Sequence, residues 1–210
     1  MVEDNANIDA LMKEISAKKP DLVEFRLDKL HERKLIEEIA RRKSFPIIAT
    51  DKSDRGQRPK LSQLSDAAAH GFDFVDLDYS DTDAAQVKEM QSEGAEVILS
   101  FHDYSRTPPK EELARVLQAQ KSLGGDISKL VTTAFQPRDN LTVLDFLESQ
   151  AASARLISFA MGRDGVASRI LSPFFGAEFT FAALSNKTQT AEGQLGIDEL
   201  RSAWRILGLQ

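Results

Sequence analysis

His102 and Lys129 are the residues of this chain whose types and positions first suggest covalent chemistry. His102 directly follows the apolar run 97–101, and Lys129 lies near the start of the next such run, 127–133. An imidazole titrates near neutral pH and is a common general acid or base. A lysine in a partly apolar, cation-rich pocket has a lowered pKa and can attack a carbonyl carbon as the free amine. The pair therefore suits chemistry beside a carbonyl. The spacing alone leaves a second interpretation open, in which the lysine is salt-bridged or solvent-facing and the histidine is structural.

Charged side chains also interrupt apolar runs that are otherwise typical of buried strands. Glu24, Arg26 and Asp28 share one face of an extended segment, and Asp76 and Asp78 share a face in another. An unpaired buried charge costs several kcal/mol. We therefore expect these groups either to fill the interior as a salt-bridge network or to line a site at the carboxyl ends of the strands.

The elements that would position these residues alternate along the chain. Runs typical of strands occupy residues 22–27, 46–50, 72–77, 96–101, 127–133, 156–160 and 179–183. Helical spacing of apolar residues marks 8–15, 31–42, 61–69, 83–93, 110–123, 141–150, a short segment 166–171, and 197–207. Strict alternation of this kind predicts right-handed βαβ units and a parallel sheet.

A (β/α)₈ TIM barrel in a single catalytic domain over residues 1–210 is the fold that this alternation favours. A barrel needs eight strands, and the missing one would have to precede the first helix, where only residues 1–3 remain. We therefore expect a truncated first strand, unless the true start lies upstream. An open doubly wound sheet is the alternative, but no glycine-rich dinucleotide turn follows the first strand.

Composition limits the classes of function. The 210 residues carry a formal net charge of −6 without a sustained basic block, which argues against a nucleic-acid partner. The apolar runs are far shorter than a membrane span, and no leader opens the chain. Cysteine is absent, which excludes disulfides and thiolate metal sites. A cytoplasmic protein that handles a small molecule, with no nucleic-acid or membrane partner, is expected.

Six motifs, in this order, resemble those of the type I 3-dehydroquinate dehydratases, the archaeal members in particular. They are residues 24–28 (EFRLD), 75–78 (VDLD), 100–104 (SFHDY), 126–129 (DISK), 161–169 (MGRDGVASR) and 193–194 (GQ). The resemblance implies a (β/α)₈ barrel and a lyase that catalyses the third step of the shikimate pathway of aromatic amino acid biosynthesis. It also implies that no metal or cofactor is used, and that the protein is a homodimer, as family members often are.

The resemblance assigns the chemistry to the two residues singled out above. Lys129 would form an imine with the C3 ketone of 3-dehydroquinate. His102 would remove a proton from C2 and then act as the acid when the C1 hydroxyl leaves as water. The positive nitrogen of the iminium accepts the electrons released at C2, and imine hydrolysis would free 3-dehydroshikimate.

Further residues match substrate-contacting positions of the family. Arg169 lies where the family holds the substrate carboxylate, and a guanidinium fork suits a bidentate carboxylate. The other matches are Glu24 and Arg26, Thr190 and Gln194 of a closing loop, and the apolar Met161 and Phe181, for which an ordinary core role stays equally open.

Three regions depart from the family pattern: the stretch after the third strand, the closing loop and the nearly absent first strand. Lys52 replaces a substrate-binding arginine, so the charge is kept but the planar fork is lost. Asp54 is the candidate for the carboxylate that orients His102, with an alignment ambiguity that would put Arg55 there instead. Glu192 stands where a proline usually precedes the glycine of the closing loop.

Two other functions stay open. The first is another class I Schiff-base lyase, such as an aldolase, although Arg169 and Gln194 match a carboxylate-binding pattern rather than a phosphate site. The second is a non-catalytic paralogue that binds carboxylates, which Lys52, Glu192 and the short N-terminus keep open.

Overall fold

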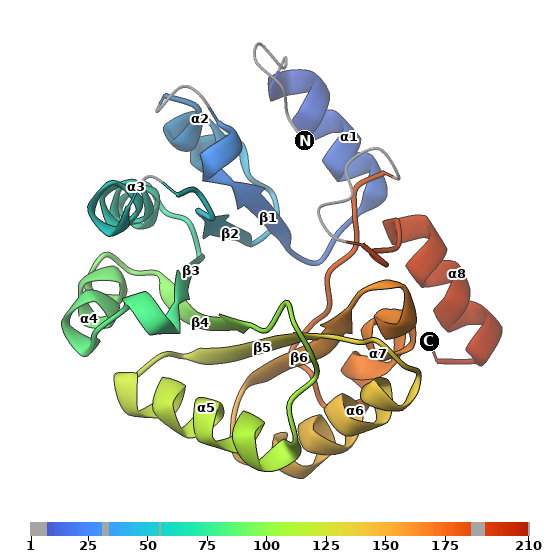
Figure 1. The fold of residues 1–210 in the computed structure, drawn as a ribbon. Coiled ribbons are helices and arrows are strands. Elements are labelled where there is room, and N and C mark those ends of the chain that lie inside the picture. The colour runs from blue at the N-terminus through green and yellow to red at the C-terminus, as the bar shows by residue number, and fades with distance from the viewer. Residues whose placement is uncertain (1–7, 31–33, 55, 186–191, 210) are drawn as a thin grey trace. The chain divides into compact units, whose positions relative to one another are not determined.

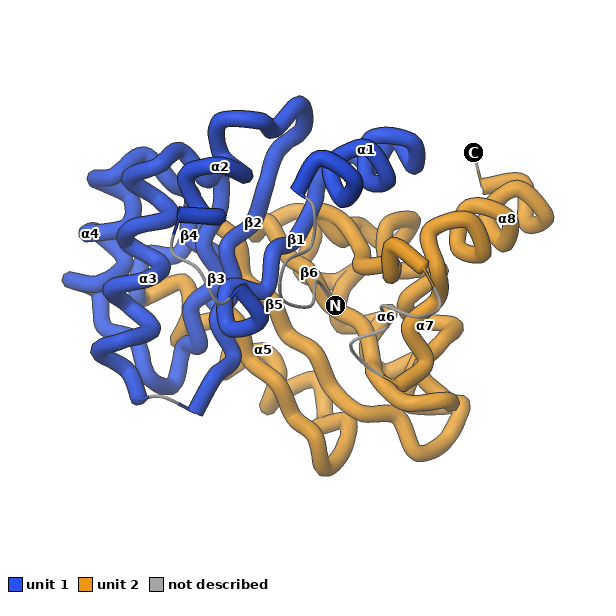
Figure 2. The backbone as a smooth tube through the Cα atoms, turned by 90° about the horizontal axis from the view of Figure 1, so that it is seen from above, with its two compact units in different colours: residues 1–99, 123–126 blue, residues 100–122, 127–210 orange. Residues whose placement is uncertain are grey.

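The computed structural model describes residues 8–30, 34–54, 56–185 and 192–209 (Figure 1). The chain divides into two compact units (Figure 2). Unit 1 comprises Met1–Leu99 with Leu123–Asp126, and unit 2 comprises Ser100–Ser122 with Ile127–Gln210.

Six strands in the described residues pair in the order in which they follow one another in the chain. They are β1 (Val23–Arg26), β2 (Ile47–Thr50), β3 (Phe74–Asp78), β4 (Glu96–His102), β5 (Ile127–Thr133) and β6 (Leu156–Met161). The pairs β1–β2, β2–β3 and β5–β6 are parallel. The division between the units falls within β4. A helix follows each strand from β1 to β6, as the alternation predicts.

Unit 1 holds β1 to β3 and four helices. The helices are α1 (Ile8–Lys18), α2 (Lys34–Arg42), α3 (Gln57–Ala69) and α4 (Ala84–Ser92). Helix α4 begins with a pair of reciprocal hydrogen bonds. The Asp83 carboxylate accepts from the backbone N–H of Gln86, and the Gln86 side-chain oxygen accepts from the backbone N–H of Asp83. This capping box satisfies N–H groups that the first turn leaves without helical partners.

The strand register of unit 1 separates charged from apolar side chains. Arg26 is in register with Thr50, and Thr50 with Asp76, so these three side chains share a face. Phe25 and Val75 lie on the opposite face and are buried. The predicted face-sharing of Glu24 and Arg26 is confirmed by this register. Asp28 differs from the prediction, because β1 ends at Arg26 and Asp28 lies in a 3₁₀ turn, Leu27–Lys29.

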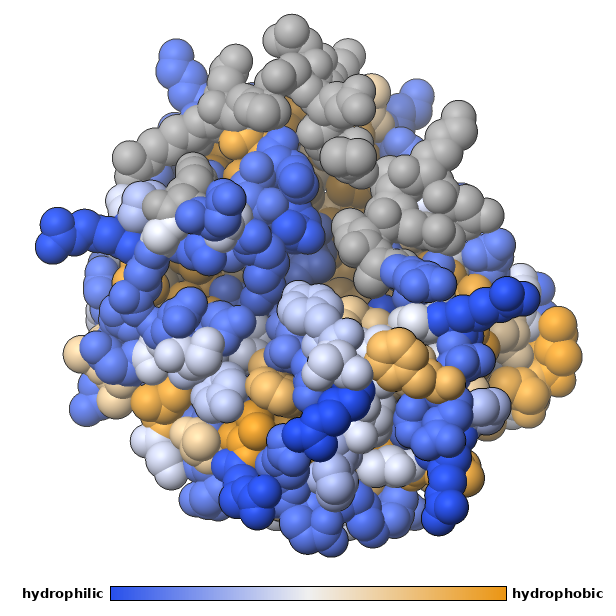
Figure 3. Space-filling model, in the orientation of Figure 1, coloured by the Kyte–Doolittle hydropathy of each residue, from blue (hydrophilic) through white to orange (hydrophobic). Residues whose placement is uncertain are grey.

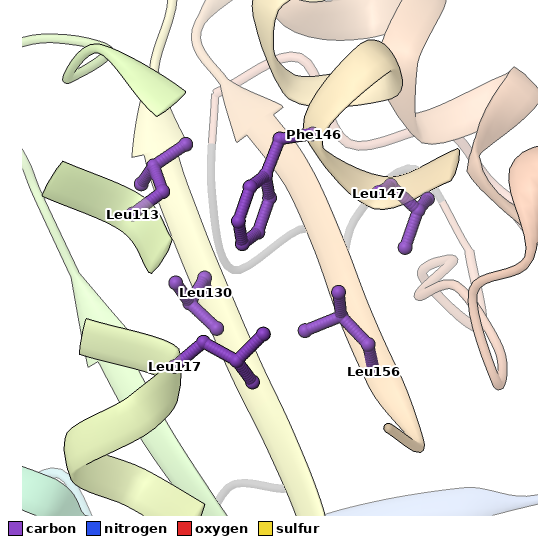
Figure 4. Close-up of a cluster of buried hydrophobic side chains, with 6 residues drawn as sticks. All are labelled: Leu113, Leu117, Leu130, Phe146, Leu147 and Leu156. Carbon is purple, nitrogen blue, oxygen red and sulfur yellow. The ribbon is translucent and has the colours of Figure 1, made fainter. Parts of the chain in front are cut away.

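Unit 2 is built on β5 and β6. Its helices are α5 (Lys110–Leu123), α6 (Arg138–Gln150), α7 (Val166–Leu171) and α8 (Ile197–Leu207). A core cluster lies between α5, α6 and these strands (Figure 4). It is formed by the buried side chains of Leu113, Leu117, Leu130, Phe146, Leu147 and Leu156.

The predicted seventh strand over 179–183 is wrong as a strand. Among the described residues its backbone pairing is confined to its ends: Glu178, just before it, donates to the carbonyl of Leu156, and Ala183 forms a single parallel bridge with Gly196. Between those points the rings of Phe179 and Phe181 contact each other, with centroids 5.5 Å apart. The apolar pattern reflects ring packing rather than a ladder. The predicted first strand, 1–3, lies outside the described residues, as does 31–33 at the start of the predicted second helix.

Apolar side chains on the surface form separate small areas among polar ones (Figure 3). The large apolar side chains most exposed in the described residues are Tyr104, Phe135, Leu141, Phe174, Ile206 and Leu207. Among the described helices, none combines the length and apolar character that a membrane crossing requires.

The core cluster predicts a contrast between two positions of α6. Phe146→Ala should lower the free energy of unfolding by about 3–5 kcal/mol, because the truncation leaves a cavity between α6 and the strands. Leu141→Ala, on the same helix with its side chain exposed, should change it by less than about 0.5 kcal/mol. Urea denaturation followed by circular dichroism measures both. Equal losses would mean that the cluster does not carry the stability assigned to it.

Candidate active site

Lys129 lies on β5 with its side chain on the face opposite α5 and α6. Leu130 belongs to the core cluster beneath those helices, and successive side chains of a strand point to opposite faces. Lys129 is in register with Ile157 of β6 and is only 5% exposed. A buried amine on this face is an unusual place for lysine, since its ammonium form is costly to remove from water.

A row of four side chains extends from Lys129 to Arg169 within unit 2. The Lys129 Nζ lies 4.6 Å from the centroid of the Phe181 ring. The Phe181 and Phe159 centroids are 6.1 Å apart, and the Arg169 Cζ lies 4.5 Å from the Phe159 centroid. Two cations therefore lie at the ends of an aromatic pair. We call Lys129, Phe181, Phe159 and Arg169 the cation–aromatic row.

Arg169 is buried without an anionic partner among the described residues. It is 3% exposed, and its Nε has no hydrogen-bond partner. Burial lowers the pKa of Arg169 to about 10, so the guanidinium still carries its charge at neutral pH. A buried, charged fork with an unsatisfied donor is chemically suited to bind an anion from outside the chain.

Arg169 is positioned by the anchoring of the short helix α7. The Ser168 Oγ donates to the carbonyl of Gly165 and accepts from the backbone N–H of Ala160, at the end of β6. The backbone N–H of Ser168 donates to the Asn140 side chain of α6. Gly165 allows this close approach, since a Cβ there would lie 2.5 Å from the Ala160 carbonyl oxygen.

His102 is the last residue of β4, and the loop that follows it is fixed against β5. The backbone N–H of Asp103 donates to the carbonyl of Val131, and the Asp103 carboxylate accepts from the backbone N–H groups of Ser105 and Arg106. Burial alone would raise the pKa of the Asp103 carboxyl, but hydrogen bonds from Ser105 and Arg106 hold it below its usual value. The His102 ring stacks on Tyr104, with centroids 5.8 Å apart.

Met161 and Gln194 lie at the end of β6 and beside the turn that follows it. Met161 is half-buried and shares a face of β6 with Phe159 by alternation. Gln194 is buried and follows Gly193, whose φ is +75°. A Cβ on Gly193 would lie 2.3 Å from the Gly162 carbonyl oxygen, so only glycine fits there. Thr190 falls outside the described residues.

In unit 1, Asp28 holds both Arg26 and the segment that carries Lys52. The Arg26 Nε and Nη2 each donate to the Asp28 carboxylate at 2.8 Å, and the backbone N–H of Lys52 donates to it at 3.3 Å. The Asp28 side chain is 5% exposed. Burial alone would raise the pKa of the Asp28 carboxyl, but the hydrogen bonds and charge of Arg26 outweigh it and lower that pKa.

Two further carboxylates on the strands of unit 1 also have partners. The Lys52 Nζ lies 2.8 Å from Asp76, whose side chain is almost fully buried, and the Thr50 hydroxyl donates to Glu24 at 2.7 Å. Asp78 is different, because it accepts from Ser80 and caps a 3₁₀ turn. The prediction that the charges on the strands are paired is confirmed for Arg26, Asp28 and Asp76.

The structure brings the predicted site residues together in two sets. Lys129, Phe181 and Arg169 form one set in unit 2, and Glu24, Arg26 and Lys52 form the other on one face and end of the unit 1 strands. Asp54 is exposed between β2 and α3, and Arg55 lies outside the described residues. Phe159 was missed by sequence reasoning. Its place two residues before Met161, on the same face of a strand, was the available signal.

Comparison with known proteins places the chain among enzymes of one kind. The family model for type I 3-dehydroquinase matches residues 1–210. The 3-dehydroquinate dehydratase of Methanocaldococcus jannaschii is 30% identical over 200 residues, covering 90% of this chain and 89% of the relative. The enzyme of that name from Pyrococcus abyssi is 31% identical over 209 residues, covering 96% and 94%.

Solved structures agree with the sequence relatives. The 3-dehydroquinate dehydratase of Geobacillus kaustophilus has a TM-score of 0.85 at 25% identity, covering 94% of this chain and 84% of that one. The Aquifex aeolicus enzyme, at 21% identity, shares the fold with a TM-score of 0.82, covering 96% and 94%. The predicted α/β barrel class is confirmed by these neighbours. On the match over its whole length and on these relatives, the chain belongs to the type I 3-dehydroquinase family.

Proposed function

We propose that this protein is a lyase that dehydrates 3-dehydroquinate to 3-dehydroshikimate through a Schiff base on Lys129. The observation that carries the proposal is a pair of buried groups joined through two aromatic rings in one unit: the Lys129 amine, and the Arg169 guanidinium, whose Nε has no hydrogen-bond partner among the described residues. Both occur in a chain of the type I 3-dehydroquinase family, whose curated relatives are named 3-dehydroquinate dehydratase.

The reaction divides between Lys129 and His102. The Lys129 Nζ attacks the C3 ketone, the carbonyl oxygen leaves as water, and a protonated imine forms. His102 takes a proton from C2, and the C2–H electron pair moves toward the iminium nitrogen to give an enamine. The enamine electrons then expel the C1 hydroxyl, which His102 protonates, so that water leaves. Water hydrolyses the conjugated imine and releases the product and the free amine.

Arg169 supplies the anion site for the substrate carboxylate. A guanidinium that is 3% exposed and has an unsatisfied Nε donor gains charge-assisted hydrogen bonds when a carboxylate arrives, in surroundings from which water is excluded. Met161 and Phe181 line the apolar side of the substrate, and Gln194 and Thr190 contact it from the closing loop.

The resemblance to the family further assigns Glu24, Arg26 and Lys52 to binding of the polar groups of the substrate, and Asp54 to orienting the catalytic histidine. Lys52 offers a single charged point rather than a fork, and Asp76 holds its Nζ at 2.8 Å. The single domain over 1–210, the cytoplasmic location and the homodimer stay predictions.

Borohydride trapping tests the imine directly. Reduction in the presence of 3-dehydroquinate should add a covalent mass to the peptide that contains Lys129, and Lys129→Ala should abolish both the adduct and turnover. His102→Ala should lower kcat by roughly 10²–10⁴-fold, the usual contribution of a general acid or base. Lys121→Ala, which removes an exposed lysine of the same unit, is the control and should leave both unchanged.

Three outcomes would contradict the mechanism. Near-wild-type turnover by Lys129→Ala would exclude the imine. A folded wild-type protein that binds 3-dehydroquinate in calorimetry but gives neither adduct nor turnover would be a carboxylate-binding paralogue, and adducts with sugar phosphates alone would indicate an aldolase.

Arg169→Met should separate function from stability. Replacing a buried, unpaired charge by an apolar side chain of similar volume should leave the free energy of unfolding unchanged or raise it by about 1–4 kcal/mol. The same change should lower kcat/KM by about 10²-fold or more, since a buried partner of the substrate carboxylate is lost. Arg163→Met, at an exposed arginine in the 3₁₀ turn before α7, should alter neither quantity. A less stable Arg169→Met protein with normal kcat/KM would make Arg169 a structural residue.

The ion pair of Asp28 with Arg26 should make a pH-dependent contribution to the free energy of unfolding. The pKa of the Asp28 carboxyl in the folded protein is lowered, so its stabilising effect is present above the unfolded value of about 3.9 and is lost as the pH falls through the folded value. Asp28→Asn should therefore lower the free energy of unfolding at pH 7 by about 1.5–3 kcal/mol. The gap from wild type should close as the pH falls below about 4. Urea titrations across that range measure it, with Asp21→Asn, at an exposed carboxylate, as the control; a gap that does not change with pH would exclude this role.

A further inference from the structure

Arg169 and Arg26 are held by different kinds of contact. Arg26 gives its Nε and Nη2 to the Asp28 carboxylate, so two of its donors are occupied. No ion pair holds Arg169 in the part of the chain that the structure describes, and its Nε is without a hydrogen-bond partner. Its guanidinium instead lies 4.5 Å from the centre of the Phe159 ring. The buried guanidinium is therefore supported by a ring face and not by an acid.

A ring face and a carboxylate have different consequences for ligand binding. The N–H donors of a guanidinium lie in its plane, and a carboxylate partner engages them there. An aromatic ring attracts the cation through its face. Such a contact steadies the guanidinium and leaves the donors in its plane available to an incoming anion.

Phe159 is itself rigidly placed. It lies on β6 in register with Val131, is 3% exposed, and packs on Phe181 at 6.1 Å. Phe181 in turn lies against the Lys129 Nζ at 4.6 Å. The two rings thus lie between the Lys129 amine and the Arg169 guanidinium. Through Phe159 they tie the positions of both groups to β6.

We infer that Phe159 is a positioning residue that holds the Arg169 guanidinium with its donors free for the substrate carboxylate, at a fixed separation from Lys129. This inference rests on the proposed function for the identity of the substrate. The contact between Phe159 and Arg169 is independent of that identity.

The test is a double-mutant cycle between Phe159 and Arg169. Phe159→Leu removes the ring and keeps an apolar side chain; it should raise KM for 3-dehydroquinate by about 10-fold, as expected for a desolvated cation–aromatic contact, and leave kcat within about 3-fold. In the Arg169→Met background the same change should have little further effect on KM, because the group that it positions is gone. Phe159→Tyr, which keeps the ring, should restore most of the affinity.

A matched control separates positioning from general loosening of the fold. Phe146→Leu makes the same substitution at a buried phenylalanine of the core cluster, on the other side of the strands, and should leave KM unchanged. Equal effects of Phe159→Leu on KM in the wild-type and Arg169→Met backgrounds would overturn the inference. An increase in KM in Phe146→Leu as large as that in Phe159→Leu would overturn it as well.

A spectroscopic signal keeps the inference separate from the proposed function. The Nε–H resonance of Arg169 in NMR should shift in Phe159→Leu and not in Phe146→Leu, because the ring current of Phe159 is lost. A wild-type protein without turnover would refute the proposed function, and this resonance would then decide the positioning role alone. An unmoved resonance would refute the positioning role even if turnover is normal.

Discussion

The free-energy cost of burying charge is the constraint on which both units depend. In unit 1 two buried carboxylates have cationic partners, Asp28 with Arg26 and Asp76 with Lys52. In unit 2 the rings of Phe181 and Phe159 lie against Lys129 and Arg169. An ion pair repays part of the lost hydration and uses the donors of the cation, whereas a ring face leaves those donors unused. The consequences differ: in unit 1 Asp28 and Asp76 are satisfied by ion pairs, whereas in unit 2 the Arg169 guanidinium keeps an unsatisfied donor among the described residues and can bind a ligand.

The Arg169 guanidinium stays in position only if the short helix α7, which carries it, is held rigidly. An isolated helix as short as α7 is not stable by itself in water. It is fixed instead by hydrogen bonds of Ser168 to the end of β6 and to Asn140 of α6. Two glycines near the start of this helix have a similar effect. Gly165 and Gly193 each lie so near a carbonyl oxygen that any side chain would push the segments apart. In the stretch 162–169 (GRDGVASR), Gly165 therefore allows the close approach to β6 that places the Arg169 guanidinium.

Much of this arrangement follows from patterns that a single chain carries. The alternation of apolar runs predicts all six described strands, because buried parallel strands are short and apolar, and the alternation of charge with apolar residues places Glu24 and Arg26 on one face. The segment 179–183 was misread, since its phenylalanines pack ring against ring and its backbone pairs only near its ends. Phe159 was passed over because an aromatic residue in an apolar run has the same pattern whether it fills a core or carries a cation. The pairing of Lys52 with Asp76 depends on how two separate segments pack together, which no local pattern supplies. Glu192 and Lys52 were recognised as departures, and for Lys52 the structure adds its counter-ion.

Arg169 has no counter-ion among the described residues, and this also affects how the proposed enzyme would distinguish its substrate from other small acids. A guanidinium without an internal counter-ion attracts carboxylates in general, and metabolites that carry one are abundant in any cell. Discrimination at the moment of encounter would therefore be modest. An acid without a ketone would reside briefly and depart, whereas a keto acid of the right shape would be captured by Lys129 as a covalent adduct. Selectivity would then be kinetic, set by whether a bound acid dissociates before Lys129 reacts with it. The rings of Phe159 and Phe181 would contribute to this selectivity, because they fix the separation between the Lys129 amine and the Arg169 guanidinium that an acid has to span.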